Sequence, residues 1–191
     1  NHGVTVRTIG ADELANAPGP LRSEIEGVLR QWLDSRRMSA MRFLVDLAPF
    51  HYPAERRYYV AEQGDRAVGF LAAVPIYAEH GWFFEDLIRV PSAPNGTAEL
   101  LVDTAMRDAQ AQGDSLVTLG LAPLSGLNAE PGPHRLTRRA LVACYDHLGP
   151  LYQFQGVRSF KERFRPDRWR DQLLVSAPPA LGVGAFHAVL G

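Results

Sequence analysis

The sequence is poor in three features that would each narrow its function: cysteine, lysine and long apolar runs. Cys144 is the single cysteine among 191 residues, so a disulfide within the chain and a zinc site built from several cysteines are both excluded. No run of 18 apolar residues could span a bilayer, and we therefore expect this chain itself to be soluble. A reducing compartment fits this composition.

Net charge is also small, at −1 with 20 basic and 21 acidic residues. Such a balance gives no general attraction to nucleic acid or anionic lipid, so binding of either requires a local basic patch. One patch lies between positions 158 and 170, where the acidic residues are Glu162 and Asp167. Its basic residues are Arg158, Lys161, Arg163, Arg165, Arg168 and Arg170.

Metal-binding and nucleophile motifs are missing as well. The spacings along the sequence do not match those of metal ligands for the histidines His51, His80, His134, His147 and His187. Residues 120–126 contain no Gly-x-Ser-x-Gly elbow, so Ser125 is interpreted as a turn residue. We therefore expect neither a metal nor a catalytic serine.

Length and hydrophobic periodicity predict one α/β (α+β) domain over residues 1–191. Helices are expected at 21–33, about 98–112 and 135–147, and strands at 42–47, 57–62, 66–76, 82–90 and 115–121. A hairpin turn is expected at 63–65, an extended segment at 151–164, and a last helix or a packed tail at 181–190. This order predicts a mixed central sheet with helices on both faces. Because the sequence begins without Met, we interpret it as a segment of a longer product.

Asp86 is a candidate general base on the predicted strand 82–90. By alternation it shares a side with Trp82, Phe84, Ile88 and Val90, where burial would raise its pKa and a nearby arginine would lower it. Arg89 lies three residues on, on the opposite face of a regular strand. The two reach one site only if a bulge or the strand end intervenes. The alternative is that Asp86 and Arg89 form a structural ion pair, or that Asp86 is a buried carboxylate whose hydrogen bonds are all made within the protein.

Lys161, Arg163 and Arg165 would form a basic row on one face of an extended segment, because they alternate with aromatic and acidic residues. Arginine makes bidentate contacts to phosphate, and lysine acts as a compact point charge. A solvated basic strand face is the alternative. The sequence has one lysine and nineteen arginines, which indicates that an ammonium is specifically required at Lys161.

The loop 91–97 opens a predicted helix, whose N-terminus would form an anion site with Asn95 or Thr97 as the cap. An ordinary capped helix start is the alternative. Trp169 is expected to pack the basic segment in place, with stacking on the end of a tRNA as a second interpretation.

Four segments carry a family resemblance: DLIR at 86–89, APNGT at 93–97, LGLAPLSG at 119–126, and YQFQGVRSFKERFRP at 152–166 followed by Trp169. In this order they closely resemble the C-terminal catalytic domain of bacterial phosphatidylglycerol lysyltransferases, also called multiple peptide resistance factors. The resemblance covers about residues 22–180. It implies a GNAT-like acyltransferase fold and transfer of an amino acid from aminoacyl-tRNA to the hydroxyl of phosphatidylglycerol, without a cofactor.

The resemblance also implies residue roles and partners. The implied catalytic residues are Asp86, Arg89, Lys161 and Arg163, and the implied substrate-binding residues are Asn95, Gly96, Thr97, Tyr152, Arg158 and Arg165. Implied partners are aminoacyl-tRNA and phosphatidylglycerol of an anionic membrane surface, with no metal. Family members carry two GNAT-like units in tandem behind a flippase, and this chain resembles the second unit. The parent protein would then act at the cytoplasmic face of the bacterial membrane.

Two alternatives are a GNAT acyltransferase that uses an acyl-coenzyme A and a GNAT-like domain that binds tRNA or lipid without catalysis. Acetyl-coenzyme A-dependent GNAT enzymes carry a Gln/Arg-x-x-Gly-x-Gly/Ala loop where this chain has 91–97. That pattern is missing, and Pro91 and Pro94 each remove a backbone donor, so coenzyme A is disfavoured. The second alternative rests on a departure from the family. Members often have an acidic residue just ahead of the Tyr152 segment, whereas residues 148–151 offer none and Asp146 is the nearest. Lysine, alanine and arginine remain open as the amino acid.

Overall fold

The computed structural model describes residues 3–15, 19–35, 48–122 and 154–171. The chain divides into two compact units, Asn1–Gly120 and Leu121–Gly191. The expectation of a single domain over the whole chain stays a prediction.

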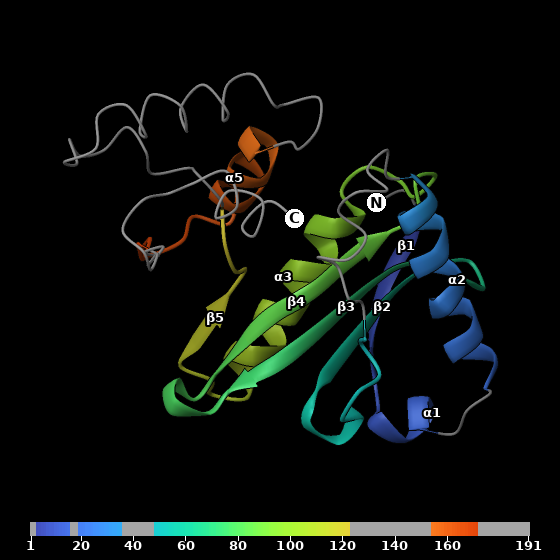
Figure 1. Cartoon of the computed structure of the whole chain (residues 1–191), viewed down its shortest axis with the longest axis horizontal. Helices are drawn as coiled ribbons and strands as arrows, with labels where there is room; N and C mark the ends of the chain where they lie inside the picture. Colours follow the sequence, from blue (N-terminus) through green and yellow to red (C-terminus); the bar gives the residue numbers. More distant parts are fainter. Residues whose placement is uncertain (1–2, 16–18, 36–47, 123–153, 172–191) are drawn as a thin grey trace, which may run out of the picture. The chain divides into compact units, whose positions relative to one another are not determined.

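A five-stranded sheet forms the centre of the first unit, in the order β1-β2-β3-β4-β5 (Figure 1). The strands are β1 Val4–Ile9, β2 Arg57–Gln63, β3 Arg66–Ile76, β4 Gly81–Arg89 and β5 Leu116–Thr118. The first four pair antiparallel, and β5 runs parallel to β4. The mixed sheet expected from the order of elements is therefore confirmed.

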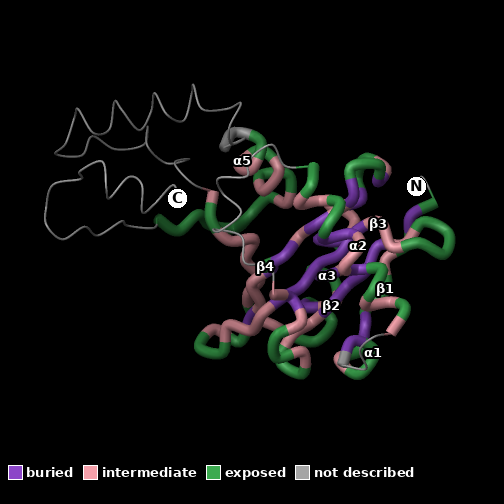
Figure 2. The backbone as a smooth tube through the Cα atoms, turned by 45° about the vertical axis from the view of Figure 1, so that its right-hand side comes forward, coloured by how far each residue is buried: buried purple, intermediate pink, exposed green. Residues whose placement is uncertain are grey.

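Two helices pack on opposite faces of this sheet. Helix α2, Pro20–Ser35, buries Ile25, Val28 and Leu29 in a core cluster that includes Tyr58 and Phe70. Helix α3, Thr97–Ala111, lies against the other face, where its side chains fill the space left by Gly69. Figure 2 shows the buried backbone running through the central strands, with exposed connections at their ends. The remaining elements of this unit are the short helix α1, Ala11–Ala15, and the 3₁₀ turns η2, Pro53–Glu55, and η3, Tyr77–Glu79.

Three polar contacts fix α3 to the sheet. The Tyr59 hydroxyl donates to Asp108 at 2.6 Å, and Arg57 pairs with Asp114. The Arg57 guanidinium also donates to the side-chain oxygen of Gln112, the C-cap of α3, at 2.5 Å. Because one end of each contact lies on a strand and the other on or just after α3, they set the position of the helix along the sheet.

Most predicted elements of the first unit are confirmed. Helices 21–33 and 98–112 and strands 57–62, 66–76 and 82–90 are all present, and the hairpin turns at Gly64 with φ +60°. The strand expected at 115–121 is shorter, because the chain turns at Gly120 with φ +71°. Strand β1 and helix α1 were not predicted. The elements expected at 42–47, 135–147 and 181–190 lie outside the described residues.

The prediction of an extended segment at 151–164 is wrong. Residues 154–162 form helix α5, Phe154–Glu162, in the second unit. Helical neighbours at i and i+4 explain this: Arg158 pairs with Glu162 at 2.6 Å, and the rings of Phe160 and Phe164 meet edge to face. The basic row on one strand face therefore does not exist. The last turn ends at Arg165, whose φ is +49°.

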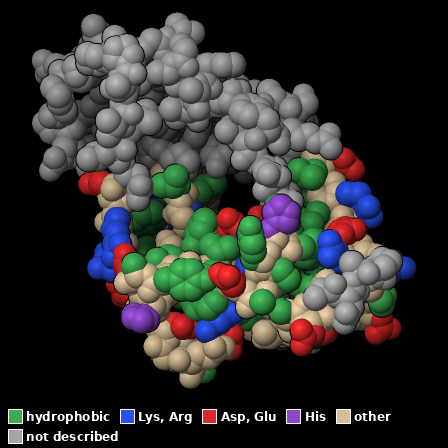
Figure 3. Space-filling model, turned by 60° about the horizontal axis from the view of Figure 1, so that its bottom comes forward, with side chains coloured by type: hydrophobic (Ala, Val, Ile, Leu, Met, Phe, Trp, Pro, Cys, Tyr) green, Lys and Arg blue, Asp and Glu red, His purple; other side chains and the backbone are tan. Residues whose placement is uncertain are grey.

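In the face shown in Figure 3, apolar side chains gather toward the middle and acidic ones lie among them. Within the described residues, no helix is long and apolar enough to cross a membrane.

Replacing Gly81 with alanine should destabilise the first unit by about 1–3 kcal/mol. The added Cβ would lie 2.5 Å from the carbonyl oxygen of Leu116, on the neighbouring strand β5. The matched control is Gly27→Ala in α2, where the new Cβ meets nothing within 4 Å and a gain of about 0.5–1 kcal/mol is expected. Urea unfolding measures both, and equal stability of the two variants would contradict the β4–β5 contact.

Candidate functional site

Asp86 lies on the face of the sheet that packs against α2. Its register partner is Ala72, which in turn pairs with Tyr58, and both of these belong to the core cluster under α2. Residues opposite each other on paired strands share a face. The side chain is 8% exposed, so the burial expected for this carboxylate is confirmed.

The Asp86 carboxylate is short of stabilising partners. Its pKa is raised to about 6, mainly by burial and also by the charge of Glu85, while Arg56 acts in the opposite direction. Among the described residues, none donates a hydrogen bond to it. The shifted pKa of this mostly buried carboxylate suits a proton acceptor near neutral pH.

A β-bulge at Glu85 determines this orientation. Phe84 pairs with Ala73 and Asp86 with Ala72, so Glu85 is the extra residue on β4. Because Ala72 and Ala73 face opposite sides of the sheet, Phe84 and Asp86 do too. The prediction that Asp86 shares a side with Trp82 and Phe84 is therefore wrong, since the bulge reverses the alternation.

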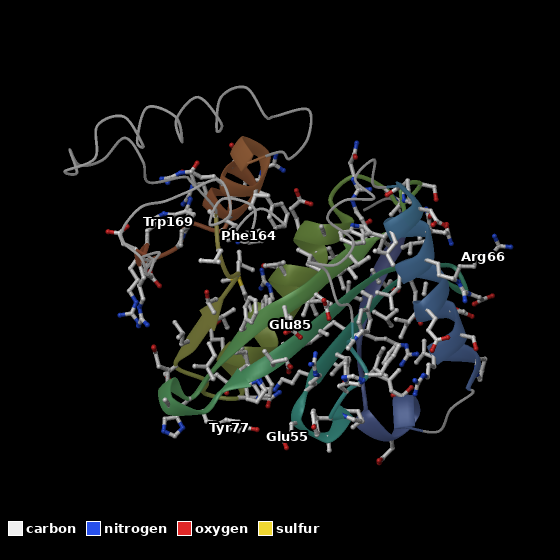
Figure 4. All side chains as sticks on the ribbon, viewed as in Figure 1. Glu55, Arg66, Tyr77, Glu85, Phe164 and Trp169 are labelled. Carbon is white, nitrogen blue, oxygen red and sulfur yellow. The ribbon has the colours of Figure 1, made fainter. Side chains whose placement is uncertain are left out.

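Glu85, labelled in Figure 4, is held by Arg56, whose guanidinium donates to it at 2.7 Å. Arg56 immediately precedes β2, and its guanidinium is mostly buried. The same cation lowers the pKa of Asp86, so the bulge, the ion pair and the buried carboxylate form one local electrostatic unit. We call Arg56, Glu85 and Asp86 the bulge site. Sequence inspection missed Arg56 and Glu85 because a bulge leaves no signature in the alternation of residues.

Arg89 lies on the other face from Asp86. It pairs with Gly69, whose missing side chain leaves room for Thr97 and Leu101 of α3. Its guanidinium donates to the carbonyl oxygen of Ala93 at 3.3 Å. The bulge precedes Asp86 and does not separate it from Arg89, so the structure keeps the two side chains apart and Arg89 braces the loop after β4.

Among the described strands, none pairs with the outer edge of β4 beside the bulge site. Strand β5 pairs with β4 only over Gly81–Phe83, and Gly120 packs against the ring of Phe83 where β5 ends. Within the described residues, positions 84–89 of β4 therefore have a strand partner on the β3 side alone. Such an edge offers main-chain hydrogen-bonding groups to an extended ligand.

Residues 94–97 line a hollow of about 320 Å³ at the start of α3. Helix α3 has Gly96 as its N-cap, without a side-chain cap, so the prediction of Asn95 or Thr97 as the cap is wrong. The Thr97 hydroxyl donates to the Pro94 carbonyl oxygen at 2.7 Å, and its backbone N–H bonds the same oxygen. The lining brings Asn95, Gly96 and Thr97 together, but it also contains Glu99 and Asp103, which oppose phosphate binding.

Lys161 lies at the end of α5 in the second unit. Its ammonium donates to the backbone carbonyl of Leu121, and burial lowers its pKa to about 8. The pKa of a buried lysine shifts readily, whereas an arginine stays charged. The lowered pKa therefore agrees with the inference that an ammonium is required at position 161.

The remaining predicted residues of the second unit lie on or just after α5. Arg158 is in the helix, stacked over the ring of Trp169, whereas Arg163 and Arg165 follow the helix and are exposed. Tyr152 lies outside the described residues. Within the part of the chain that the structure describes, no group of three or more His, Cys, Asp or Glu side chains could hold a metal ion.

Comparison with known proteins gives one consistent family. The sequence model described as phosphatidylglycerol lysyltransferase, C-terminal, matches residues 1–175. The phosphatidylglycerol lysyltransferase of Bacillus subtilis (strain 168) is 27% identical over 152 residues, which cover 79% of this chain and 17% of that protein. The chain thus spans less than a fifth of the length of this relative.

Solved structures agree on the fold. The L-PGS of Bacillus licheniformis superposes with a TM-score of 0.59 at 21% identity, covering 86% of this chain and 48% of that one. An aminoglycoside acetyltransferase from an uncultured soil metagenomic sample gives a TM-score of 0.55 at 10% identity. The superposition covers 94% of this chain and 99% of that one. At these identities the likeness shows the fold alone, which is the GNAT-like mixed sheet expected from the sequence.

Asp86→Asn should stabilise the chain at neutral pH. The pKa of Asp86 is about 6 in the folded state and 3.8 in the unfolded state, so ionisation of this group lowers the free energy of unfolding. The full penalty applies above pH 6, and there is no penalty below pH 4. The neutral amide removes this penalty, which for about two pKa units is at most about 3 kcal/mol. Urea unfolding at pH 7.5 should show the gain, and at pH 4 the variant and the native chain should be equal. A variant less stable at pH 7.5 would contradict the buried, donor-poor environment.

Changing the charges of the bulge site should move the pKa of Asp86 in opposite directions. Arg56→Gln removes the cation and should raise it, whereas Glu85→Gln removes the anion and should lower it. Carboxyl ¹³C shifts of labelled aspartate, followed against pH, report this directly. Glu55→Gln is the matched control, since its carboxylate accepts from the Tyr77 hydroxyl and should leave Asp86 unchanged. Shifts of the same sign in both bulge variants would mean a general loosening of the structure.

Proposed function

This chain belongs to the family of phosphatidylglycerol lysyltransferase C-terminal domains, and from that premise we propose that it transfers an amino acid from aminoacyl-tRNA to the hydroxyl of phosphatidylglycerol or a related lipid. The observation that carries the proposal is Asp86: a mostly buried carboxylate with a pKa of about 6, on a part of β4 that has a strand partner on one side alone within the described residues. A group with these properties can accept a proton near neutral pH.

In the proposed reaction the lipid hydroxyl oxygen attacks the carbonyl carbon of the aminoacyl ester. The hydroxyl proton passes to the Asp86 carboxylate as the new carbon–oxygen bond forms. The bond to the ribose oxygen of the tRNA then breaks, and that oxygen takes up a proton. The products are the aminoacyl lipid and free tRNA, so one ester is exchanged for another and the step needs no redox cofactor or metal.

The basic residues predicted from the sequence are proposed to bind the phosphate groups of the substrates or the developing oxyanion. We assign phosphate binding to Arg158, Arg163 and Arg165 and either phosphate binding or stabilisation of the developing oxyanion to Lys161. Arg89 has a positioning role in this scheme, because its contact with Ala93 braces the loop that carries Asn95, Gly96 and Thr97. Tyr152 keeps the substrate-binding role implied by the family resemblance.

The alternative of an acyl-coenzyme A donor has weaker support. A coenzyme A site at the start of α3 would need backbone N–H groups aimed at pyrophosphate. Here the N–H of Thr97 already bonds the Pro94 carbonyl oxygen, and the hollow is lined by Glu99 and Asp103. Both features disfavour a polyanion at that position.

The setting of the reaction follows from the proposed acceptor. Phosphatidylglycerol lies in the membrane and aminoacyl-tRNA in the cytoplasm, so we place the chain at the cytoplasmic face of the bacterial membrane. A second GNAT-like unit and a flippase belong to this proposal as parts of a longer parent protein.

Bacteria expressing the complete gene should accumulate a new amine-positive lipid, and Asp86→Ala and Lys161→Ala should each abolish it. Loss of a general base typically lowers a rate by about 10²–10⁴-fold. Thin-layer separation of the lipids with a stain for primary amines measures the product, and hydrolysis of the spot identifies the amino acid.

Arg107→Ala is the matched control, because this arginine on α3 is highly exposed and its ion pair is with Asp103, one turn away in the same helix. It should leave the lipid product at the native level. Unchanged product in both site variants would overturn the assigned roles, and no product from well-expressed native protein would favour binding without catalysis.

A further inference from the structure

The second unit presents an aromatic ring within its basic segment. Trp169 is 44% exposed and lies in the chain that follows α5 (Figure 4). The Arg158 guanidinium lies over this ring, 4.7 Å from its centroid, and is itself held by Glu162 at 2.6 Å. The ring is thus anchored through a cation that is fixed on the helix, and it still exposes a large part of its surface.

Charge around this ring is strongly positive for a chain of net charge −1. Positions 158–170 contain six basic and two acidic residues. Four of the arginines are exposed: Arg163, Arg165, Arg168 and Arg170. Exposed arginines near an exposed aromatic ring are typical of surfaces that bind single-stranded nucleic acid, where bases stack and phosphates pair with arginine.

A membrane surface fits this segment less well. Interfacial binding depends on a face of several apolar side chains that enter the bilayer. Between positions 156 and 171, Trp169 is the one exposed large apolar side chain, and Phe160 and Phe164 pack against each other. A single exposed ring such as that of Trp169 can stack on a nucleobase, because every base offers a planar face.

We propose that Trp169, braced by Arg158, is a stacking platform for a base in the single-stranded 3′ end of an RNA, with the exposed arginines of 163–170 contacting its phosphates. Identification of that RNA as the aminoacyl-tRNA donor rests on the proposed function. The binding of single-stranded RNA to this surface does not, because it requires no transfer reaction.

The test is fluorescence anisotropy of a labelled 12-nucleotide single-stranded RNA ending in CCA, titrated with the 191-residue chain. Trp169→Ala should weaken binding by about 5- to 100-fold, the range expected for loss of one stacked base. Trp169→Phe keeps a ring and should bind within about twofold of the native chain. Tyr52→Ala is the matched control, because Tyr52 is 78% exposed in the first unit and should have no effect.

A second pair of variants separates phosphate contact from net charge. Arg165→Gln and Arg107→Gln remove the same charge from exposed arginines in different units. Only Arg165→Gln should reduce the slope of log affinity against log salt, by about 0.7.

Three results would overturn the proposal: no RNA binding by the native chain, equal binding by Trp169→Ala, or the same salt slope for both arginine variants. Binding to vesicles of phosphatidylglycerol and phosphatidylethanolamine is measured in parallel. If Trp169→Ala loses vesicle binding and keeps RNA binding, the surface is a membrane contact instead. Failure of the proposed function would show as absence of the amine-positive lipid, which is a separate measurement.

Discussion

One extra residue in β4 determines which face of the sheet carries the acidic group. Without the bulge at Glu85, Asp86 and Phe84 would share a side, and the carboxylate would point at α3. With it, Phe84 packs toward α3 and Asp86 is buried on the α2 face, next to an ion pair made by Glu85 and Arg56. The bulge thus places a carboxylate in an apolar environment and supplies one charge of each sign beside it. The elevated pKa of Asp86 follows from that placement.

Ionised Asp86 lowers the free energy of unfolding at neutral pH, and this supports a functional role for the residue. Ionising a buried carboxylate that no described residue hydrogen-bonds makes folding less favourable at neutral pH. Stability alone would favour an amide or an apolar residue at position 86, so the presence of an aspartate there needs another reason, and proton transfer is one. Lys161 shows the same pattern in the second unit, where burial lowers the pKa of the single lysine of the chain to about 8.

The sequence predicted the elements whose periodicity is strong and local. Alternation identified β2, β3 and β4, helical spacing identified α2 and α3, and glycines marked the turns at Gly64 and Gly113. It failed where a single residue or a distant partner decides the outcome. The bulge at Glu85 reverses the facing of its neighbours without changing the residue pattern. The segment 154–162 has an alternation that suits a strand, and contacts such as Arg158 with Glu162 favour the helix. The family resemblance depended on the order of motifs, which survives such local errors.

The central claim is that Asp86 accepts the proton during transfer to the lipid hydroxyl, and the pH dependence of that transfer tests it most directly. Initial rates can be measured with purified aminoacyl-tRNA and phosphatidylglycerol vesicles between pH 4.5 and 7.5, with substrate below saturation. The account predicts that the rate falls below a midpoint near pH 6, with the slope of a single protonation, because the carboxylate is lost there. A rate that stays constant down to pH 4.5 would show that no group with the pKa of Asp86 takes part, and would contradict the account.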